Sequence, residues 1–106
     1  MTLGDIQNQV DRWTKQFKVQ YWEPHQILSR LMEETGELAR EVNHLYGPKP
    51  KKPSEDTKDM ADEISDILFT LCCLANSKGI DLDVAFARMM DKYNDRDSNR
   101  YEKKRD

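Results

Sequence analysis

Residues 67–75 read Ile67-Leu68-Phe69-Thr70-Leu71-Cys72-Cys73-Leu74-Ala75. Wound into an α-helix at about 3.6 residues per turn, this stretch is apolar on all sides. A helix that is hydrophobic all round must be covered all round. In a chain of 106 residues a second copy is the natural cover, and local side chains are the alternative. The stretch therefore predicts a helical bundle completed by oligomerisation, with homodimer and homotetramer both open.

Two helices are predicted ahead of this stretch by apolar residues at spacings of three and four. The first spans residues 3–19, and its apolar face consists of Leu3, Ile6, Val10, Trp13 and Phe17. The second spans residues 24–46. Pro24 suits its first turn, where a missing N–H costs nothing. Gly47 and Pro48 form a typical stop.

The helix that contains residues 67–75 is predicted to begin after a cap at Ser54 or Asp56 and to end near Ser77. A fourth helix follows, capped by Asp81 or Asp83, and its apolar face consists of Leu82, Ala85 or Phe86, Met89, Met90 and Tyr93. The prediction is thus an all-α domain of four helices over residues 1–97, followed by a polar tail over residues 98–106.

The composition excludes several classes of protein. The chain carries 20 acidic and 17 basic residues, for a net charge of -3. Binding to a nucleic-acid polymer needs a basic face, so that class is disfavoured. Residues 1–10 contain no apolar core of a signal peptide, and no apolar stretch reaches the ~20 residues that span a bilayer. We expect no membrane partner.

The two cysteines, Cys72 and Cys73, are adjacent in the sequence. Neighbouring residues rarely reach the geometry of a disulfide, and both lie in the apolar stretch. We interpret them as reduced thiols in the protein interior. Reduced cysteines are typical of the cytoplasm, which is the compartment we expect.

Two pairs of carboxylates carry the chemistry. Glu34 and Glu37 are three residues apart on the second predicted helix, and Glu63 and Asp66 repeat that spacing on the third. Residues three apart are neighbours on one helix surface, and both pairs flank the apolar stripe. If the two helices pack antiparallel, the pairs converge, and their mutual repulsion calls for a divalent cation. Oxygen ligands suit Mg²⁺ or Mn²⁺ better than zinc.

Two other interpretations of these acidic residues remain open from spacing alone. The carboxylates can be solvated surface groups, some paired within a helix to Arg30, Arg40 or Lys58. A di-iron bundle would need a Glu-x-x-His unit on each of two helices. Glu41 and His44 supply one such unit, and His25 is the only other histidine, which argues against di-iron.

The combination Glu33-Glu34-x-x-Glu37 and Glu63-x-x-Asp66 resembles the signature of the MazG-like nucleotide pyrophosphohydrolases. The flanking residues 38–43 and 62–68 also resemble that family, and the likeness covers roughly residues 20–97. It implies an all-α bundle, a dimer or pair of dimers, that hydrolyses a nucleoside triphosphate to monophosphate and pyrophosphate. Related dUTPases and phosphoribosyl-ATP pyrophosphohydrolases share the architecture, so these sibling substrates stay open.

The resemblance also implies roles for individual residues. The Mg²⁺ ligands would be Glu34, Glu37, Glu63 and Asp66. Their charges, added to those of a triphosphate, would need divalent cations for neutralisation. We expect that a water would attack the α-phosphorus in line and that Glu33 or Glu37 would accept its proton. The phosphate-contacting segment would contain Lys92, Asn94 and Arg96, whose alternative role is a solvated helix end.

Aromatic residues gather around the break between the first two predicted helices. Trp13 and Phe17 fit the apolar stripe, so we predict that they pack in the core. Trp22 and His25 fall outside it, and we predict that they contact the substrate base. The alternative from another class is a non-enzymatic helical dimerisation module, which would leave the carboxylates solvated and gain no stability from Mg²⁺.

Overall fold

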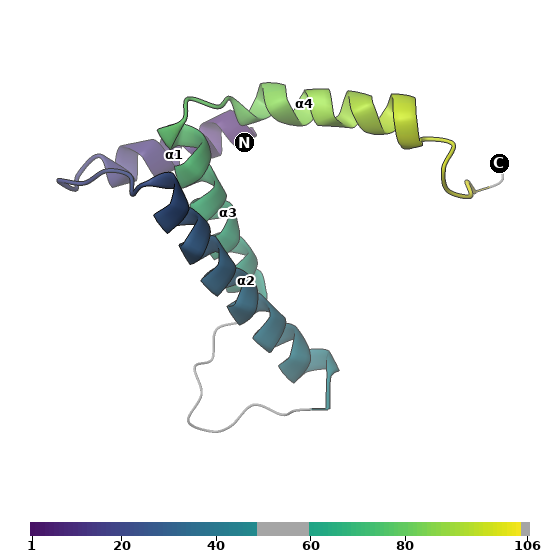
Figure 1. The fold of residues 1–106 in the computed structure, drawn as a ribbon, viewed down its shortest axis with the longest axis horizontal. Coiled ribbons are helices and arrows are strands. Elements are labelled where there is room, and N and C mark those ends of the chain that lie inside the picture. Colours follow the sequence, from purple (N-terminus) through teal and green to yellow (C-terminus); the bar gives the residue numbers. More distant parts are fainter. Residues whose placement is uncertain (49–59, 105–106) are drawn as a thin grey trace.

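The computed structural model describes residues 1–48 and 60–104. These residues form the α-helices α1 (Leu3–Thr14), α2 (Pro24–Tyr46), α3 (Met60–Ser77) and α4 (Leu82–Lys92), followed by the short π-helix η1 (Tyr93–Asp97). No strand occurs among them. The all-α fold predicted from the sequence is confirmed (Figure 1).

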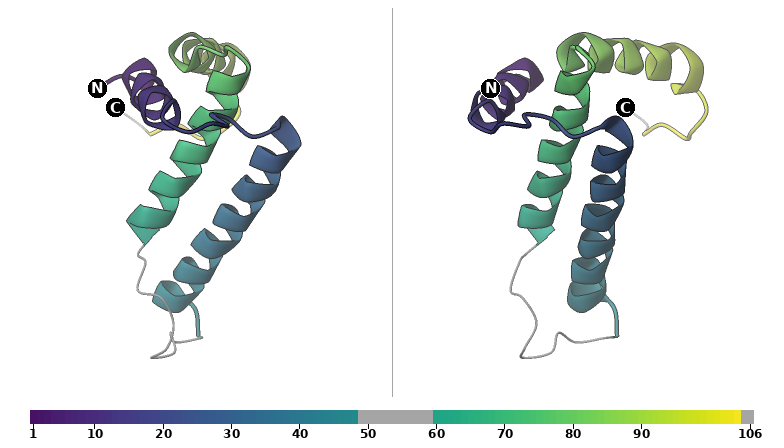
Figure 2. Two further views of the ribbon diagram at one scale, coloured as in Figure 1. Left: turned by 90° about the vertical axis from the view of Figure 1, so that its left-hand side faces the viewer. Right: turned by 60° about the vertical axis from the view of Figure 1, so that its left-hand side comes forward.

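Helices α2 and α3 form the main pair of the fold. They lie side by side and antiparallel, and α1 and α4 lie at the end where α2 begins and α3 ends (Figure 2). The predicted bounds of α2 are confirmed, from Pro24 at its first turn to Tyr46 before Gly47. The predicted caps of α3, Ser54 and Asp56, lie outside the described residues.

Helix α1 is shorter than predicted. It begins with a capping box between Thr2 and Asp5, but it ends at Thr14 instead of residue 19. Lys15 N–H still completes the helical hydrogen bond to Asp11 O, but Phe17 N–H donates to Thr14 O at 3.1 Å, only three residues back. The helix therefore ends in a tighter turn, beyond which Gln20 Nε2 donates to Asp11 O at 3.2 Å.

Helix α4 begins where the sequence predicts. Asp81 is the N-cap, and its Oδ1 accepts hydrogen bonds from the backbone N–H groups of Asp83 at 3.0 Å and Val84 at 3.3 Å. The turn ahead of it contains Gly79 at φ 65°, a conformation that glycine adopts without steric cost. From there α4 extends away from α2 and α3 as an arm that buries none of its residues (Figure 1).

The apolar core of a single chain is small. Among the described residues, the buried apolar side chains are Val10, Ile27, Cys72 and Ala75. Ile64, Phe69 and Leu71 of α3 stay exposed, although the sequence predicts that this helix is covered on all sides. The radius of gyration is 17.6 Å, whereas a compact chain of this length has about 13 Å. The fold therefore leaves apolar surface that one chain does not cover.

Two smaller sequence predictions concern the cysteines and membrane segments. Cys72 and Cys73 are both free thiols, as predicted. Within residues 1–48 and 60–104, no helix combines the length and the apolar character that crossing a bilayer requires.

Candidate active site

Three carboxylates meet at the interface between α2 and α3. Glu34 and Glu37 come from successive turns of α2, and Glu63 comes from the first turn of α3. Their ligand atoms all lie within 4.8 Å of one another. Glu34 is 1% exposed and Glu63 is 2% exposed, while Glu37 is half-buried. The antiparallel packing of α2 and α3 thus brings together three of the four predicted ligands.

This cluster has the chemistry of a cation site. Buried carboxylates are costly because they lose their hydration, and like charges at this distance repel. Oxygens on opposite sides of a Mg²⁺ ion at about 2.1 Å lie about 4.2 Å apart, close to the observed spread of 4.8 Å. The donor set consists of oxygens alone, which suits Mg²⁺ or Mn²⁺. A fully solvated acidic surface does not describe Glu34 and Glu63.

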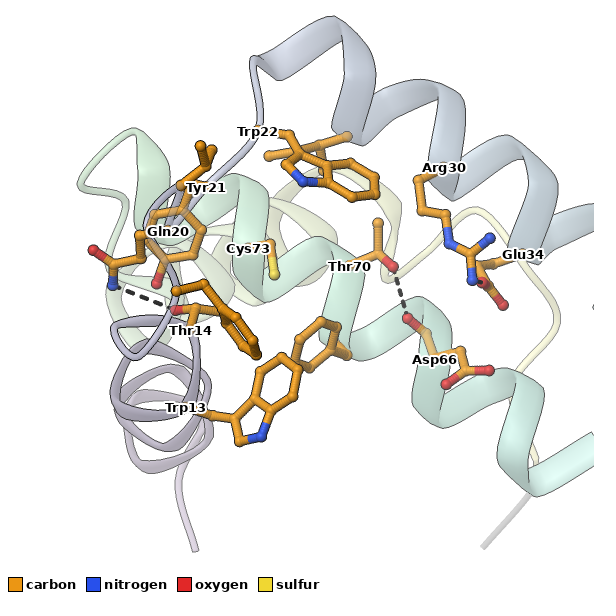
Figure 3. A pocket seen from close by; sticks show the side chains of 14 residues that line it. Trp13, Thr14, Gln20, Tyr21, Trp22, Arg30, Glu34, Asp66, Thr70 and Cys73 are labelled. Carbon is orange, nitrogen blue, oxygen red and sulfur yellow. Dashed lines mark hydrogen bonds and ion pairs between the residues drawn. The ribbon is translucent and has the colours of Figure 1, made fainter.

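The fourth predicted ligand, Asp66, lies one turn after Glu63 on α3. It is half-buried and lines the adjoining pocket, but it does not belong to the three-carboxylate cluster. Its backbone carbonyl accepts a hydrogen bond of 2.8 Å from Thr70 Oγ1 (Figure 3). Asp66 therefore lies at the edge of the pocket, as does Glu34 of the cluster.

Glu33 and Glu34 share a cationic neighbour on their own helix. Arg30 Nη2 forms an ion pair with Glu34 Oε1, and Arg30 Nη1 lies 3.3 Å from Glu33 Oε2. The intrahelical pairing with Arg30 that the sequence left open is therefore present. Glu33 differs from Glu34 in its setting, since its side chain is largely exposed.

A pocket of about 580 Å³ adjoins the carboxylates. Arg30, Glu34 and Asp66 line it on one side, and most of the other lining side chains are aromatic or apolar (Figure 3). Its remaining lining residues are Trp13, Thr14, Phe17, Val19, Gln20, Tyr21, Trp22, Ile27, Phe69, Thr70 and Cys73. This volume is in the range of small-molecule sites, and the lining combines flat apolar surfaces with a charged edge.

The aromatic lining corrects one prediction. Trp13 and Phe17 were expected in the core, but they are 55% and 49% exposed and line the pocket. Their rings meet edge to face with centroids 5.0 Å apart, and Trp13 meets Phe69 at 5.8 Å. Helical spacing places Trp13 correctly on the face of α1 that borders the pocket. It does not predict that α1 ends at Thr14, so that Phe17 lies beyond the helix.

The two residues predicted to contact a base are placed differently. Trp22 lines the pocket, as a base contact requires. His25 is exposed at the start of α2 and is not among the lining residues. Phe69, Thr70 and Cys73 of α3 line the pocket without having been singled out in the sequence, because they belong to the same apolar run that also supplies core residues.

Hydrogen bonds behind the pocket hold its wall in place. Tyr21 Oη donates to Asp11 Oδ1 at 2.6 Å, and Asn76 Nδ2 donates to Tyr21 Oη at 3.0 Å. Gln20 Nε2 also donates to Asp11 Oδ1, at 2.9 Å. The hydrogen bond from Tyr21 lowers the pKa of Asp11, and burial raises the pKa of Tyr21. The hydrogen bonds of this wall therefore join the ionised carboxylate of Asp11 to the neutral phenol of Tyr21.

Cys73 is the sulfur-containing member of the pocket lining. Burial raises the pKa of its thiol to about 11. The thiol is the protonated form at neutral pH, and a thiol is a poor nucleophile and metal ligand. Cys73 therefore contributes an apolar surface to the pocket.

The three residues of the predicted phosphate-contacting segment lie elsewhere. Lys92 ends α4, and Asn94 and Arg96 belong to η1. All three are exposed at the far end of the arm, which leads away from the carboxylate cluster within one chain (Figure 1). One copy of the chain does not bring them to the cluster.

Comparison with known proteins identifies the family. The model of the MazG nucleotide pyrophosphohydrolase domain matches residues 22–101. The protein YpjD of Bacillus subtilis (strain 168), described as uncharacterized, is 55% identical over 103 residues, which cover 97% of this chain and 93% of YpjD.

Solved structures agree with that match. The crystal structure of Bacillus subtilis YpjD superposes with a TM-score of 0.79 at 56% identity, over 89% of this chain and 96% of that one. A Bacillus-conserved MazG protein, described as a nucleotide pyrophosphohydrolase, gives a TM-score of 0.78 at 42% identity, over 93% of this chain and 96% of that one. The chain described here belongs to the MazG nucleotide pyrophosphohydrolase family.

Proposed function

We propose that this protein is a Mg²⁺-dependent nucleoside triphosphate pyrophosphohydrolase, which converts a ribo- or deoxyribonucleoside triphosphate to the monophosphate and pyrophosphate. The observation that carries the proposal is the convergence of Glu34, Glu37 and Glu63 within 4.8 Å, two of them buried, beside a pocket with aromatic walls. Family membership supports the class of reaction, and the geometry supports the assignment of residues.

The metal would be held by the three clustered carboxylates. Asp66, one turn away on the same face of α3, would join them when its side chain turns from the pocket edge. When bound, Mg²⁺ polarises phosphoryl oxygens and lowers the pKa of a coordinated water. Mn²⁺ prefers the same oxygen donors and is the expected substitute.

The nucleoside would occupy the aromatic part of the pocket. The flat rings of Trp13 and Trp22 offer surfaces for a base, and stacking of this kind contributes about 1–3 kcal/mol per base. The charged edge of the same pocket contains Glu34 and Asp66. A nucleotide with its base among the rings would therefore direct its phosphates toward the carboxylate cluster.

The protein must also orient a water molecule and accept its proton. Glu37 belongs to the cluster and is half-buried, so it can hold a water against the α-phosphorus. Glu33 is exposed beside Arg30 and is the second candidate for the base. In-line attack requires the water and the leaving pyrophosphate on opposite sides of the phosphorus, and positioning supplies most of the rate in such reactions.

We infer that the active form contains further copies of the chain. Helix α4 buries none of its residues and exposes Val84, Phe86, Met89 and Met90, and α3 also keeps apolar side chains in solvent. Exposed apolar surface of this extent is typical of an interface between subunits. A second copy that covers it is the route by which Lys92, Asn94 and Arg96 would approach a substrate.

The decisive experiment measures products. The purified protein is incubated with a panel of ribo- and deoxyribonucleoside triphosphates and phosphoribosyl-ATP, with Mg²⁺ or with EDTA, and the products are separated by chromatography. We expect monophosphate plus pyrophosphate, lost with EDTA and in Glu37→Gln. Glu102→Gln, which removes an exposed carboxylate in the C-terminal segment, is the matched control and keeps full activity.

The other outcomes discriminate among the alternatives. Diphosphate plus phosphate would move the cleavage to the γ-phosphate and contradict the mechanism. Strong preference for dUTP or phosphoribosyl-ATP would assign one of the sibling activities. No turnover by folded protein, combined with no stabilisation by Mg²⁺, would favour the non-enzymatic dimerisation module.

A further inference from the structure

The guanidinium of Arg30 lies on the carboxylate cluster itself. One nitrogen pairs with Glu34, a member of the cluster, and another lies 3.3 Å from Glu33. Arg30 is also the cationic residue among those that line the described pocket (Figure 3). A positive charge thus bridges two neighbouring glutamates at the edge of the proposed metal site.

The ion pair with Glu34 is more than a helix-surface contact. Glu34 is 1% exposed, whereas the Arg30 side chain is 43% exposed. On a helix, a cation placed four residues before an anion is the less favourable order for an ion pair. The usual preference for ion pairs along a helix therefore does not account for the contact. The burial of Glu34 accounts for it, because a buried carboxylate needs a compensating positive charge.

Arginine is suited to this position because its planar guanidinium presents several N–H donors that match a carboxylate. The contact with Glu34 can be released by a movement of the Arg30 side chain. This side chain is partly in solvent, which gives it room to swing out while the buried carboxylate stays in place. Arg30 pairs with Oε1 of Glu34, and a divalent cation bound to Glu34 would neutralise the same carboxylate and repel the guanidinium.

We propose that Arg30 is a built-in counter-ion of the metal site, which pairs with Glu34 in the metal-free protein and is displaced when the metal binds. This inference rests on the proposed function, because it assumes that the cluster binds Mg²⁺. The affinity for Mg²⁺ is then set by competition between Mg²⁺ and the Arg30 guanidinium for Glu34. Removal of the guanidinium should strengthen Mg²⁺ binding, whereas removal of a residue that holds the ligands in position would weaken it.

The test uses metal binding without nucleotide. Wild-type protein, Arg30→Met and Arg30→Gln are freed of metal with EDTA, dialysed and titrated with Mg²⁺ at pH 8 by calorimetry, and thermal unfolding is measured in parallel. Arg88→Met is the matched control, because Arg88 is exposed on α4, away from the cluster. Both Arg30 variants should bind Mg²⁺ about tenfold more tightly than wild type, and their metal-free forms should unfold at a lower temperature.

Each result decides the matter. Mg²⁺ affinity unchanged or weakened in the Arg30 variants, with a normal response of the wild type, would overturn the counter-ion role and leave the proposed metal site intact. No Mg²⁺ binding by the wild type would refute the metal site and the counter-ion role together. Tighter binding in Arg88→Met as well would show that general charge, and not the contact with Glu34, controls affinity.

Discussion

The α2–α3 pair and the α4 arm distribute their side chains in opposite ways. The pair buries Glu34 and Glu63, while the arm exposes Phe86 and Met89 to solvent. Water normally draws charge outward and drives apolar groups inward. Each inversion is what the proposed function expects: a cation would compensate the buried carboxylates, and a second copy of the chain would cover the exposed apolar face.

Removal of one clustered carboxylate is expected to have the largest effect. Glu63→Gln takes an anionic oxygen from the cluster, so the protein should lose at least about a hundredfold in turnover. It should also lose the stabilisation by Mg²⁺, which reaches about 2.7 kcal/mol at one hundred times the dissociation constant. Turnover and thermal unfolding with and without Mg²⁺ measure both effects. A variant that keeps its response to Mg²⁺ would separate Glu63 from the metal.

A charge introduced on α4 tests whether a second copy of the chain covers its exposed apolar face. Phe86→Glu places an anion in the exposed apolar face of α4, where an isolated chain would tolerate it. If a second copy covers this face, the substitution should weaken assembly by about 2 kcal/mol or more. Analytical ultracentrifugation over a range of concentrations measures this loss, with Arg88→Glu as the control. Identical sedimentation of Phe86→Glu and wild type would exclude this face as the interface.

The sequence predicted some elements of this fold because their signals are local. The bounds of α2 follow from Pro24 and Gly47, and the cap of α4 follows from Asp81. The predicted end of α1 was wrong. After Thr14 the chain turns, and Gln20 donates back to the carbonyl of Asp11, a contact that a periodic pattern of apolar residues does not encode.

In the candidate site, too, the sequence predicted the placement of some residues and not of others. Convergence of Glu34, Glu37 and Glu63 was predictable, because the spacing of three and the antiparallel pairing of two long helices leave few alternatives. The roles of Trp13 and Phe17 were not predictable, because spacing assigns a face of a helix without saying whether that face is filled or open. Where a pocket opens depends on the path of the connecting loop.

A substitution in the aromatic wall of the pocket is expected to have an effect of intermediate size. Trp13→Leu removes a half-exposed ring from the pocket, and the loss of base stacking should raise KM about tenfold with little change in kcat. Tyr101→Leu, which removes an exposed ring outside the pocket, is the control. Steady-state kinetics on the preferred nucleotide measures the effect. A fall in kcat at constant KM would instead place Trp13 near the reacting phosphates.

The smallest expected effect concerns the hydrogen bonds behind that wall. Tyr21→Phe removes the hydroxyl that donates to Asp11 and accepts from Asn76, and it should lower the free energy of unfolding by about 1 kcal/mol at pH 7. Tyr101→Phe, at an exposed position, should have no effect.

The pH dependence of that difference follows from the direction of the pKa shift. The pKa of Asp11 is lowered from its ordinary value of 3.8 by the hydrogen bond from Tyr21. Such a group stabilises the fold fully above 3.8 and loses this contribution as the pH falls through its lowered pKa. The gap in melting temperature between wild type and Tyr21→Phe should therefore stay constant from pH 7 to pH 5 and narrow below pH 3.8. A gap that does not narrow at all as the pH falls below 3.8 would show that the charge of Asp11 does not contribute to it.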